Sequence, residues 1–315
     1  MRLTLSKDNI NKYSKKGSRT IENLYGFFTA VIPLLGFAIF CILPIVISTI
    51  YSFKEINPDA VGGPYELSSY ISVGFANFKK VITDPVFWKG VGNTFINCLV
   101  TPLCMFFGLV IALIVSNTKL FGRNFFKALF FIPYVCSIVA TCLIWVCLLE
   151  MDGPLYNWFH EHAMPWVDLT NPDFVRPFMI FLGVWSGTGF SVIMYTAALT
   201  NTDSGIIEAS KIDGANKWQT FWHVTFPSIM PVTFFLLVTG IIGNLQDFTR
   251  FSLVGGYDVA DGAYITMAYY LYHYMDPYYL KLGLACAASW VLTIIVLVVT
   301  ISQFVVNRRQ GDTTK

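Results

Sequence analysis

Charged side chains are scarce in this sequence of 315 residues. Asp, Glu, Lys and Arg make up 13% of it and hydrophobic residues 55%, whereas about a quarter of an ordinary soluble domain is charged. This composition is typical of an integral membrane protein. The formal net charge of +2 is too small to favour nucleic acid or a polyanion as a partner.

Several sequence motifs of catalytic and metal sites are also missing. The seven cysteines lie in apolar runs without a C-x-x-C pair, so neither a disulfide framework nor a zinc site is predicted. No G-x-x-x-x-G-K-[ST] motif occurs, so this chain is not expected to hold the phosphates of ATP. GTGFSV at 187–192 lacks the third glycine of a dinucleotide site, and His160-Glu161-His162 has no matching ligands and is interpreted as solvated surface. No metal site and no enzyme activity are predicted.

Long apolar stretches are present instead. A membrane-spanning helix needs roughly 20 apolar residues, and six stretches meet this criterion, at about 24–51, 90–116, 125–149, 177–200, 230–253 and 282–306. We therefore expect an all-α integral membrane protein. Its membrane domain would cover 23–306, between a basic tail at 1–22 and a short tail at 307–315.

Basic residues predict the orientation of these spans. They precede the first span, surround the connection between the second and third, and follow the last: Lys7, Lys12, Lys15, Lys16, Arg19, Lys119, Arg123, Lys127, Arg308 and Arg309. Cytoplasmic connections carry this excess of Lys and Arg, so both termini are expected in the cytoplasm. The first apolar run is too long for a signal peptide and lacks a cleavage site, so it is expected to remain as a span.

The cytoplasmic connection at 201–227 is longer than a turn requires. Residues 205–212 predict a short helix that stops at Asp213-Gly214, since glycine tolerates the left-handed conformation of a helix end. Asn216, with Gln219 three residues later, predicts a capping box that starts a second helix. We expect that helix to end at Pro227 and to present one apolar face, formed by Trp218, Phe221, Trp222 and Thr225.

The stretch EASKIDGANKWQTFWHVTFP at 208–227 resembles the EAA loop of permease subunits in binding-protein-dependent ABC importers. The pattern of that loop is E-A-A, three residues, G, nine residues, I-x-L-P. It is matched by Glu208-Ala209-Ser210, Gly214 and Val224-Thr225-Phe226-Pro227, with similar residues at the three positions that differ. The stretches at 75–100, 130–145 and 184–199 are similar to the carbohydrate branch of this family, specifically to its maltose-transporter-like first permease.

The resemblance implies a bacterial inner-membrane protein with several partners. These are a second homologous permease, ATPase subunits that bind ATP and Mg, and an external or periplasmic sugar-binding protein. Glu208, Ala209, Ser210 and Gly214 would couple the permease to the ATPase, whose closure drives alternating access. No cofactor is expected in this chain. Membrane lipids are expected as its remaining partners.

Polar and small residues inside the spans predict a substrate site, because polar groups are costly in a bilayer. In the fifth span Gly240, Gly243, Asn244, Asp247 and Phe251 follow i, i+3, i+4 spacing, which predicts one helix face. Matched to the family, the sugar site would comprise Tyr134, Ser186, Gly187, Phe190, Gly243, Asn244 and Asp247. Gly183, Ile138 and the charge of Asp247 depart from the family pattern.

Other interpretations of these residues stay open. Gly183 fits close helix packing. Asp247 could pair with Arg250, which could reach the outer surface by snorkelling. The Tyr-rich stretch at 264–279 predicts an amphipathic helix in the aromatic belt of the membrane.

Two other functions also remain open. One is a secondary sugar transporter in which Asp247 couples transport to protons, and the other is an ABC importer of a solute that is not a sugar. The absence of a second intramembrane acid and the presence of the EAA-like loop argue against the first. The carbohydrate-type stretches argue against the second.

Overall fold

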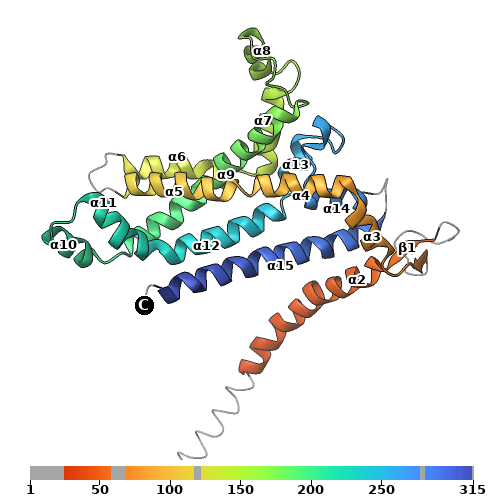
Figure 1. Ribbon diagram of the computed structural model, residues 1–315, viewed down its shortest axis with the longest axis horizontal. Coiled ribbons are helices and arrows are strands. Elements are labelled where there is room, and N and C mark those ends of the chain that lie inside the picture. The colour runs from red at the N-terminus through yellow and green to blue at the C-terminus, as the bar shows by residue number, and fades with distance from the viewer. Residues whose placement is uncertain (1–24, 58–68, 117–121, 277–280, 314–315) are drawn as a thin grey trace, which may run out of the picture.

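Long apolar helices lying side by side form the body of the protein in the computed structural model, which describes residues 25–57, 69–116, 122–276 and 281–313 (Figure 1). These helices are α4 (Pro85–Asn97), α5 (Val100–Val115), α9 (Pro172–Thr200), α12 (Phe226–Leu245) and α15 (Leu282–Thr313). The predicted tail at 1–22, Lys119 and residues 277–279 of the Tyr-rich stretch lie outside the described residues.

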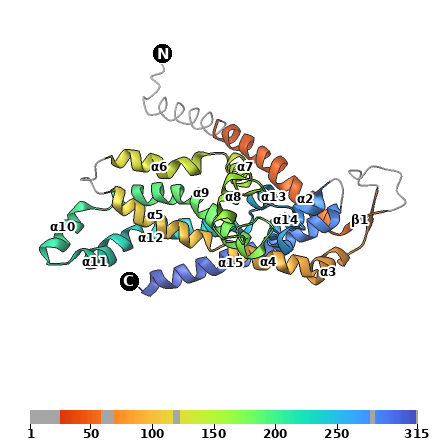
Figure 2. The same ribbon diagram turned by 90° about the horizontal axis from the view of Figure 1, so that it is seen from above.

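Shorter elements gather at the two ends of this body (Figures 1 and 2). One end holds α10 (Ser204–Ile212), α11 (Lys217–Thr220) and the C-terminal end of α15. The opposite end holds α3 (Ala76–Thr83), α14 (Met267–Met275) and an antiparallel pair of strands, β1 (Lys54–Ile56) and β2 (Tyr70–Ser72), in which Glu55 pairs with Ile71. The remaining elements are η1 (Ala38–Ile42), α2 (Leu43–Ser52), α6 (Arg123–Val135), α7 (Ile138–Leu149), α8 (Pro154–Glu161), η3 (Phe221–Thr225), α13 (Thr249–Val254) and η4 (Ala260–Gly262).

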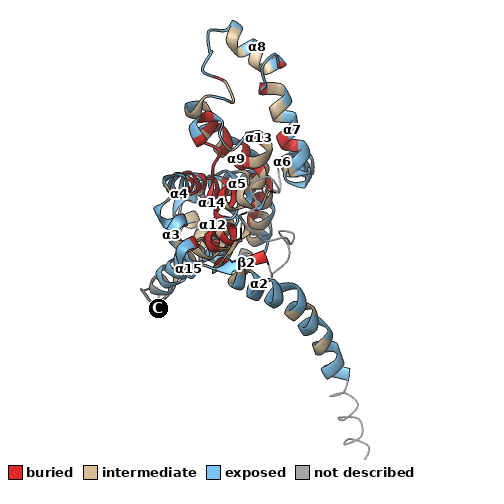
Figure 3. Ribbon diagram, turned by 90° about the vertical axis from the view of Figure 1, so that its right-hand side faces the viewer, coloured by how far each residue is buried: buried red, intermediate tan, exposed pale blue. Residues whose placement is uncertain are grey.

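The predicted number of membrane spans is confirmed. Within the described residues, six helical stretches are long and apolar enough to cross a bilayer: Tyr25–Ser52, Pro85–Val115, Ile138–Glu161, Pro172–Thr200, Lys217–Leu245 and Leu282–Arg308. The chain is therefore an all-α, multi-pass membrane protein. The first of these stretches packs against α15 through α2 and diverges from the others towards its N-terminal end, and its residues are largely exposed (Figure 3).

The third predicted span is not one continuous helix. It is divided into α6 and α7 by Cys136 and Ser137, whose backbones are extended at φ −63°, ψ 144° and φ −56°, ψ 128°. Pro133 lies in the last turn of α6 and cannot donate a backbone hydrogen bond there, which weakens the helix where it ends. Beyond the break, α7 packs against α13.

Two further helix ends differ from the prediction. Pro227 does not end a helix, because η3 leads directly into α12 and the helical path is continuous over 217–245. The Phe226 N–H donates to the carbonyl of Phe221, and this wider π turn accommodates the proline. At its other end α12 stops at Leu245 rather than continuing to 253, so Asp247 lies in a turn and does not share a helix face with Gly243.

The first part of the Tyr-rich segment is buried in the protein, whereas Tyr272 is 47% exposed. Tyr264 and Tyr270 are fully buried and Tyr269 is 8% exposed. The Tyr264 hydroxyl donates to the Leu169 carbonyl at 2.8 Å, and that of Tyr270 donates to Asp84 Oδ2 at 2.7 Å. These partners satisfy the polar ends of the rings, so burial of the tyrosines costs little.

Candidate functional site

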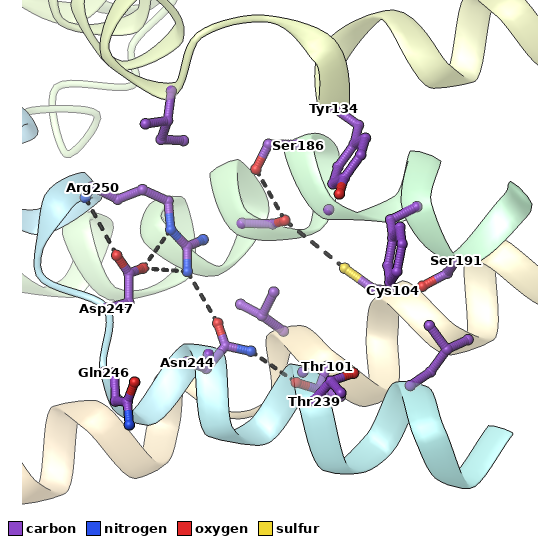
Figure 4. Close-up of a pocket in the computed structure, with 18 of the residues that line it drawn as sticks. Thr101, Cys104, Tyr134, Ser186, Ser191, Thr239, Asn244, Gln246, Asp247 and Arg250 are labelled. Carbon is purple, nitrogen blue, oxygen red and sulfur yellow. Dashed lines mark hydrogen bonds and ion pairs between the residues drawn. The ribbon is translucent and has the colours of Figure 1, made fainter. Parts of the chain in front are cut away.

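A cavity of about 610 Å³ opens between α5, α6, α9, α12 and the turn after α12 (Figure 4). The structure brings together around it all seven residues of the predicted substrate site: Tyr134, Ser186, Gly187, Phe190, Gly243, Asn244 and Asp247. These residues come from three segments that are far apart in the sequence.

The wall of the cavity formed by α6 and α9 is aromatic. The rings of Tyr134 and Phe190 stack with centroids 5.4 Å apart and planes 24° apart. The two helices approach closely here because Gly189 has no side chain: a Cβ on Gly189 would lie 2.7 Å from the Phe130 carbonyl oxygen and 3.0 Å from the Tyr134 Cβ. Tyr134 is 45% exposed and lines the cavity, so its ring is accessible from it.

The opposite wall carries a chain of hydrogen bonds. Asn244 Nδ2 donates to Thr101 Oγ1 at 2.8 Å, and Arg250 Nη2 donates to Asn244 Oδ1 at 3.1 Å. Arg250 also forms an ion pair with Asp247 (Figure 4). The predicted pairing of Asp247 with Arg250 is confirmed, but the prediction that Arg250 snorkels is wrong, because this residue is 8% exposed.

Gly183 makes room for the guanidinium group of Arg250. A Cβ at Gly183 would overlap Arg250 Nη1 and would lie 2.9 Å from a methyl group of Val100. Close packing at Gly183 is thus confirmed, with an arginine side chain among its neighbours. Without this glycine, the arginine would lose its place beside α9.

The other predicted positions differ in what they offer a ligand. A Cβ on Gly243 would meet no atom of the described residues within 4 Å, whereas one on Gly187 would lie 3.0 Å from Cys104 Sγ. The Ser186 hydroxyl donates to the Leu182 carbonyl of its own helix at 2.8 Å. Its oxygen can still accept a hydrogen bond.

Sequence reasoning missed the contribution of α5 and, apart from Asp247, that of the segment after α12. Polar atoms that line the cavity come from Thr101 and Cys104 of α5, from Gln246 in the turn after α12, and from Thr249 and Arg250 at the start of α13. A signal for α5 was available, since Asn97, Thr101, Cys104 and Gly108 recur every three or four residues and all four are buried. No comparable pattern marks the turn.

The segment between α9 and α12 contains the predicted short helix α10 and the predicted start of the second helix, which continues into α12. Asp203 caps α10 by accepting from Gly205 N at 2.8 Å, and Gly214 ends the turn after α10 with φ +82°. The capping box is present, because Asn216 and Gln219 bond each other's backbone N–H groups at 2.8 Å.

Three of the four predicted coupling residues are exposed at the surface of this segment, namely Glu208, Ala209 and Gly214. Ser210 is partly buried, and its hydroxyl lies 3.3 Å from that of Thr220, which links α10 to α11. The apolar Ile206 and Ile212 are 55% and 87% exposed. This short helix therefore presents both apolar and charged side chains at one end of the molecule (Figure 2).

Comparisons with known proteins agree with this architecture. Residues 105–312 match the family described as binding-protein-dependent transport system inner membrane component. The lactose transport system permease protein of Rhizobium radiobacter is 31% identical over 75% of this chain and 81% of its own length. A multiple sugar-binding transport system permease protein of Streptococcus mutans is 27% identical over 92% of this chain and 98% of its own.

Among solved structures, a chain of a bacterial alginate ABC transporter in complex with a periplasmic protein that holds an alginate pentasaccharide has a similar fold. The TM-score is 0.77 at 22% identity, over 92% of this chain and 96% of that one. The matched region contains α9 to α15 and with them most of the cavity and the segment between α9 and α12. The chain belongs to the family of binding-protein-dependent transport system inner membrane components.

Proposed function

We propose that this chain is a permease subunit of an ATP-driven importer for sugars, most simply oligosaccharides, in a bacterial inner membrane. One observation carries the proposal. The continuous helical run over 217–245 begins beside the exposed helix α10 and ends at Asn244 in the cavity. A movement imposed on α10 can thus reach the cavity through a single rigid element.

The chemistry of the cavity supports a sugar as the substrate. The ring of Tyr134 offers an apolar face, which suits the apolar face of a sugar ring. Asn244, Gln246 and Thr101 offer amide and hydroxyl groups that can donate to and accept from sugar hydroxyls. The names of the relatives, which include lactose and multiple-sugar transport systems, support the same substrate class.

The exposed face of α10 supports a cytoplasmic protein partner. An exposed helix with Ile206, Glu208 and Ile212 on its surface suits docking into a groove of another protein. Glu208, Ala209, Ser210 and Gly214 would form this contact with an ATPase subunit, which would bind the ATP and Mg. A second homologous permease and an external sugar-binding protein would complete the complex.

In this complex the partners shift a conformational equilibrium. Binding of ATP to the ATPase pair and docking of the sugar-loaded protein favour the outward-open state, and release of the nucleotide favours the inward-open state. The cytoplasmic location of α10, and with it of the C-terminal end of α15, follows from the excess of basic residues on that side. The chain itself would carry out no chemical step on the sugar.

The exposed helix α10 argues against a proton-coupled carrier. A carrier that works without an ATPase would not need the EAA-like segment, which keeps Glu208 and Ile212 at the surface. This observation favours the ATP-driven function over that alternative.

Purification in mild detergent followed by mass spectrometry tests the proposal. We expect a second six-span permease and an ATPase with a P-loop motif to be recovered with this chain. Glu208→Lys should release the ATPase but not the second permease, because Glu208 lies on the exposed α10. Recovery of the wild-type chain alone, still able to transport sugar in liposomes without ATP, would overturn the proposal.

A further inference from the structure

A second cavity lies between α6 and α9, apart from the substrate cavity. The two helices touch where Gly189 meets Phe130 and Tyr134. On the side of this contact nearer to α10, a groove of about 420 Å³ separates them. Its walls are formed by Lys127, Val192, Ile193, Thr196, Ala197, Thr200 and Asn201, of which Thr196 is half-buried.

Lys127 supplies the charge of this groove. No Asp or Glu is among the lining residues, and Lys127 forms no ion pair in the part of the chain that the structure describes. The N-terminal end of α6 and the C-terminal end of α9 meet here, so their opposite helix dipoles offset each other. A half-buried lysine without a carboxylate partner therefore leaves a net positive charge.

The other walls of the groove are of two kinds. Thr200 and Asn201 are exposed at the end of α9 and can bond a polar headgroup. The exposed Ile193 and Ala197 form an apolar surface along the same helix towards the middle of the membrane, whereas Val192 is 2% exposed. Polar and charged groups thus lie at the end of the helices and apolar groups deeper, which is the order of headgroup and acyl chain in a phospholipid.

The geometry points to a binding site for an anionic phospholipid in this groove, with its phosphate beside Lys127 and an acyl chain along Ile193 and Ala197. Basic pockets between membrane helices bind acidic headgroups in this way. A free phosphate ion would use the lysine but not the apolar wall. The orientation in the proposed function assigns the lipid to the cytoplasmic leaflet, and the site itself does not depend on that assignment.

Native mass spectrometry of the purified complex tests the site. The complex is placed in nanodiscs of phosphatidylcholine with or without phosphatidylglycerol, and the phosphatidylglycerol molecules that remain bound are counted. Lys127→Ala removes the charge, Ala197→Trp fills the groove while keeping the charge, and Arg308→Ala removes an exposed cation on another helix as the control. We expect retention to fall roughly fivefold in the first two variants and to stay unchanged in the control.

Further variants and controls distinguish a bound lipid from a folding defect, a soluble anion or a covering protein. Lys127→Arg should retain the lipid, which would exclude a folding defect as the cause of a loss. Equal retention in wild type, Lys127→Ala and Ala197→Trp would overturn the site. Displacement of phosphatidylglycerol by inorganic phosphate would also overturn the lipid site, because the ligand would then be a soluble anion. Crosslinking of Ala197→Cys to the second permease would overturn it as well, because protein rather than lipid would cover the groove. Because the lipid count requires neither ATP nor sugar, its failure is distinct from failure of the proposed transport function.

Discussion

At the scale of single residues, the most unusual feature is an ion pair inside a membrane protein. The side chains of Asp247 and Arg250 are 13% and 9% exposed, and Arg250 also bonds Asn244. Charged groups away from water are stable only when they are paired and hydrogen bonded. The pair and Asn244 thus fix the turn that follows α12 and the polar wall of the cavity.

Removing one partner of this pair should be more harmful than removing both. Arg250→Met leaves the Asp247 carboxylate unpaired and should lower the free energy of unfolding by roughly 3–5 kcal/mol. Combining it with Asp247→Leu should cost less than Arg250→Met alone, because no charge then remains unpaired. Unfolding in detergent measures these values, and additive losses would contradict the account of the pair.

Two glycines of the cavity give a matched test of packing. Gly183→Ala should destabilise the protein by about 1–3 kcal/mol, since its Cβ would overlap Arg250 and crowd Val100. Gly243→Ala should leave stability almost unchanged, because nothing lies within 4 Å of the added Cβ, but it should alter sugar uptake by narrowing the cavity. Thermal unfolding and uptake measured on both variants check this, and equal loss of stability in the two would contradict it.

At the scale of elements, the segment between α9 and α12 depends on the left-handed backbone conformation of one residue, Gly214. Gly214 has φ +82°, so a side chain there adopts a left-handed conformation at a cost of roughly 1–2 kcal/mol. Gly214→Pro cannot adopt that conformation, since proline fixes φ near −65°.

Changes in this segment should uncouple transport without affecting membrane insertion. Gly214→Pro should abolish uptake by disrupting the turn, and Glu208→Lys should do so by reversing a charge on the exposed face. Gly214→Ala serves as the milder control and should retain part of the activity. Uptake and membrane levels are measured together, and normal uptake in both severe variants would exclude a coupling role.

The helix α14 should respond to pH through His273. The ring of His273 stacks on Tyr257 with centroids 3.7 Å apart, and burial lowers the pKa of His273 below its ordinary value of 6.5. The unfolded chain then binds the proton more readily than the folded one. Stability should therefore fall as the pH drops from 6.5 towards the lowered pKa. His273→Gln should flatten this part of the profile in thermal unfolding, and an unchanged slope would show that another group is responsible.

The elements differ in how far the sequence predicts them. The capping box of Asn216 and Gln219 and the turn at Gly214 depend on neighbours a few residues away, so local pattern was sufficient. The break between α6 and α7 was missed although Pro133 was visible, because a proline is also tolerated inside a span when packing compensates. The end of α12 was missed because Asp247 bonds forward to Arg250, and Thr266 donates to the Asp247 carbonyl from a distant segment.

The candidate site, too, is only partly predictable from local sequence. The family resemblance gave residues that the fold gathers around one cavity, but the burial of Arg250 depends on the room left by Gly183 on a different helix. Burial of the tyrosines before α15 likewise depends on Asp84 and Leu169, which are distant in the sequence. Contacts of this kind have no local pattern from which to predict them.

At the scale of the whole molecule, the cavity and α10 are separate sites linked by α12. The ring of Tyr134 and the polar groups around Asn244 suit a sugar, and α10 suits a protein that hydrolyses ATP. Transport then requires that both sites act on the same pair of conformations. Coupling between the cavity and α10 through α12 is therefore what transport depends on.

The most direct test is sugar uptake by the purified complex in liposomes. The sugar-binding protein and a labelled oligosaccharide are placed on the side of the membrane opposite α10, and ATP on the same side as α10. We predict uptake that requires ATP and the binding protein and that Glu208→Lys abolishes, with no response to a proton gradient. Uptake driven by a proton gradient in the absence of ATP would contradict the account.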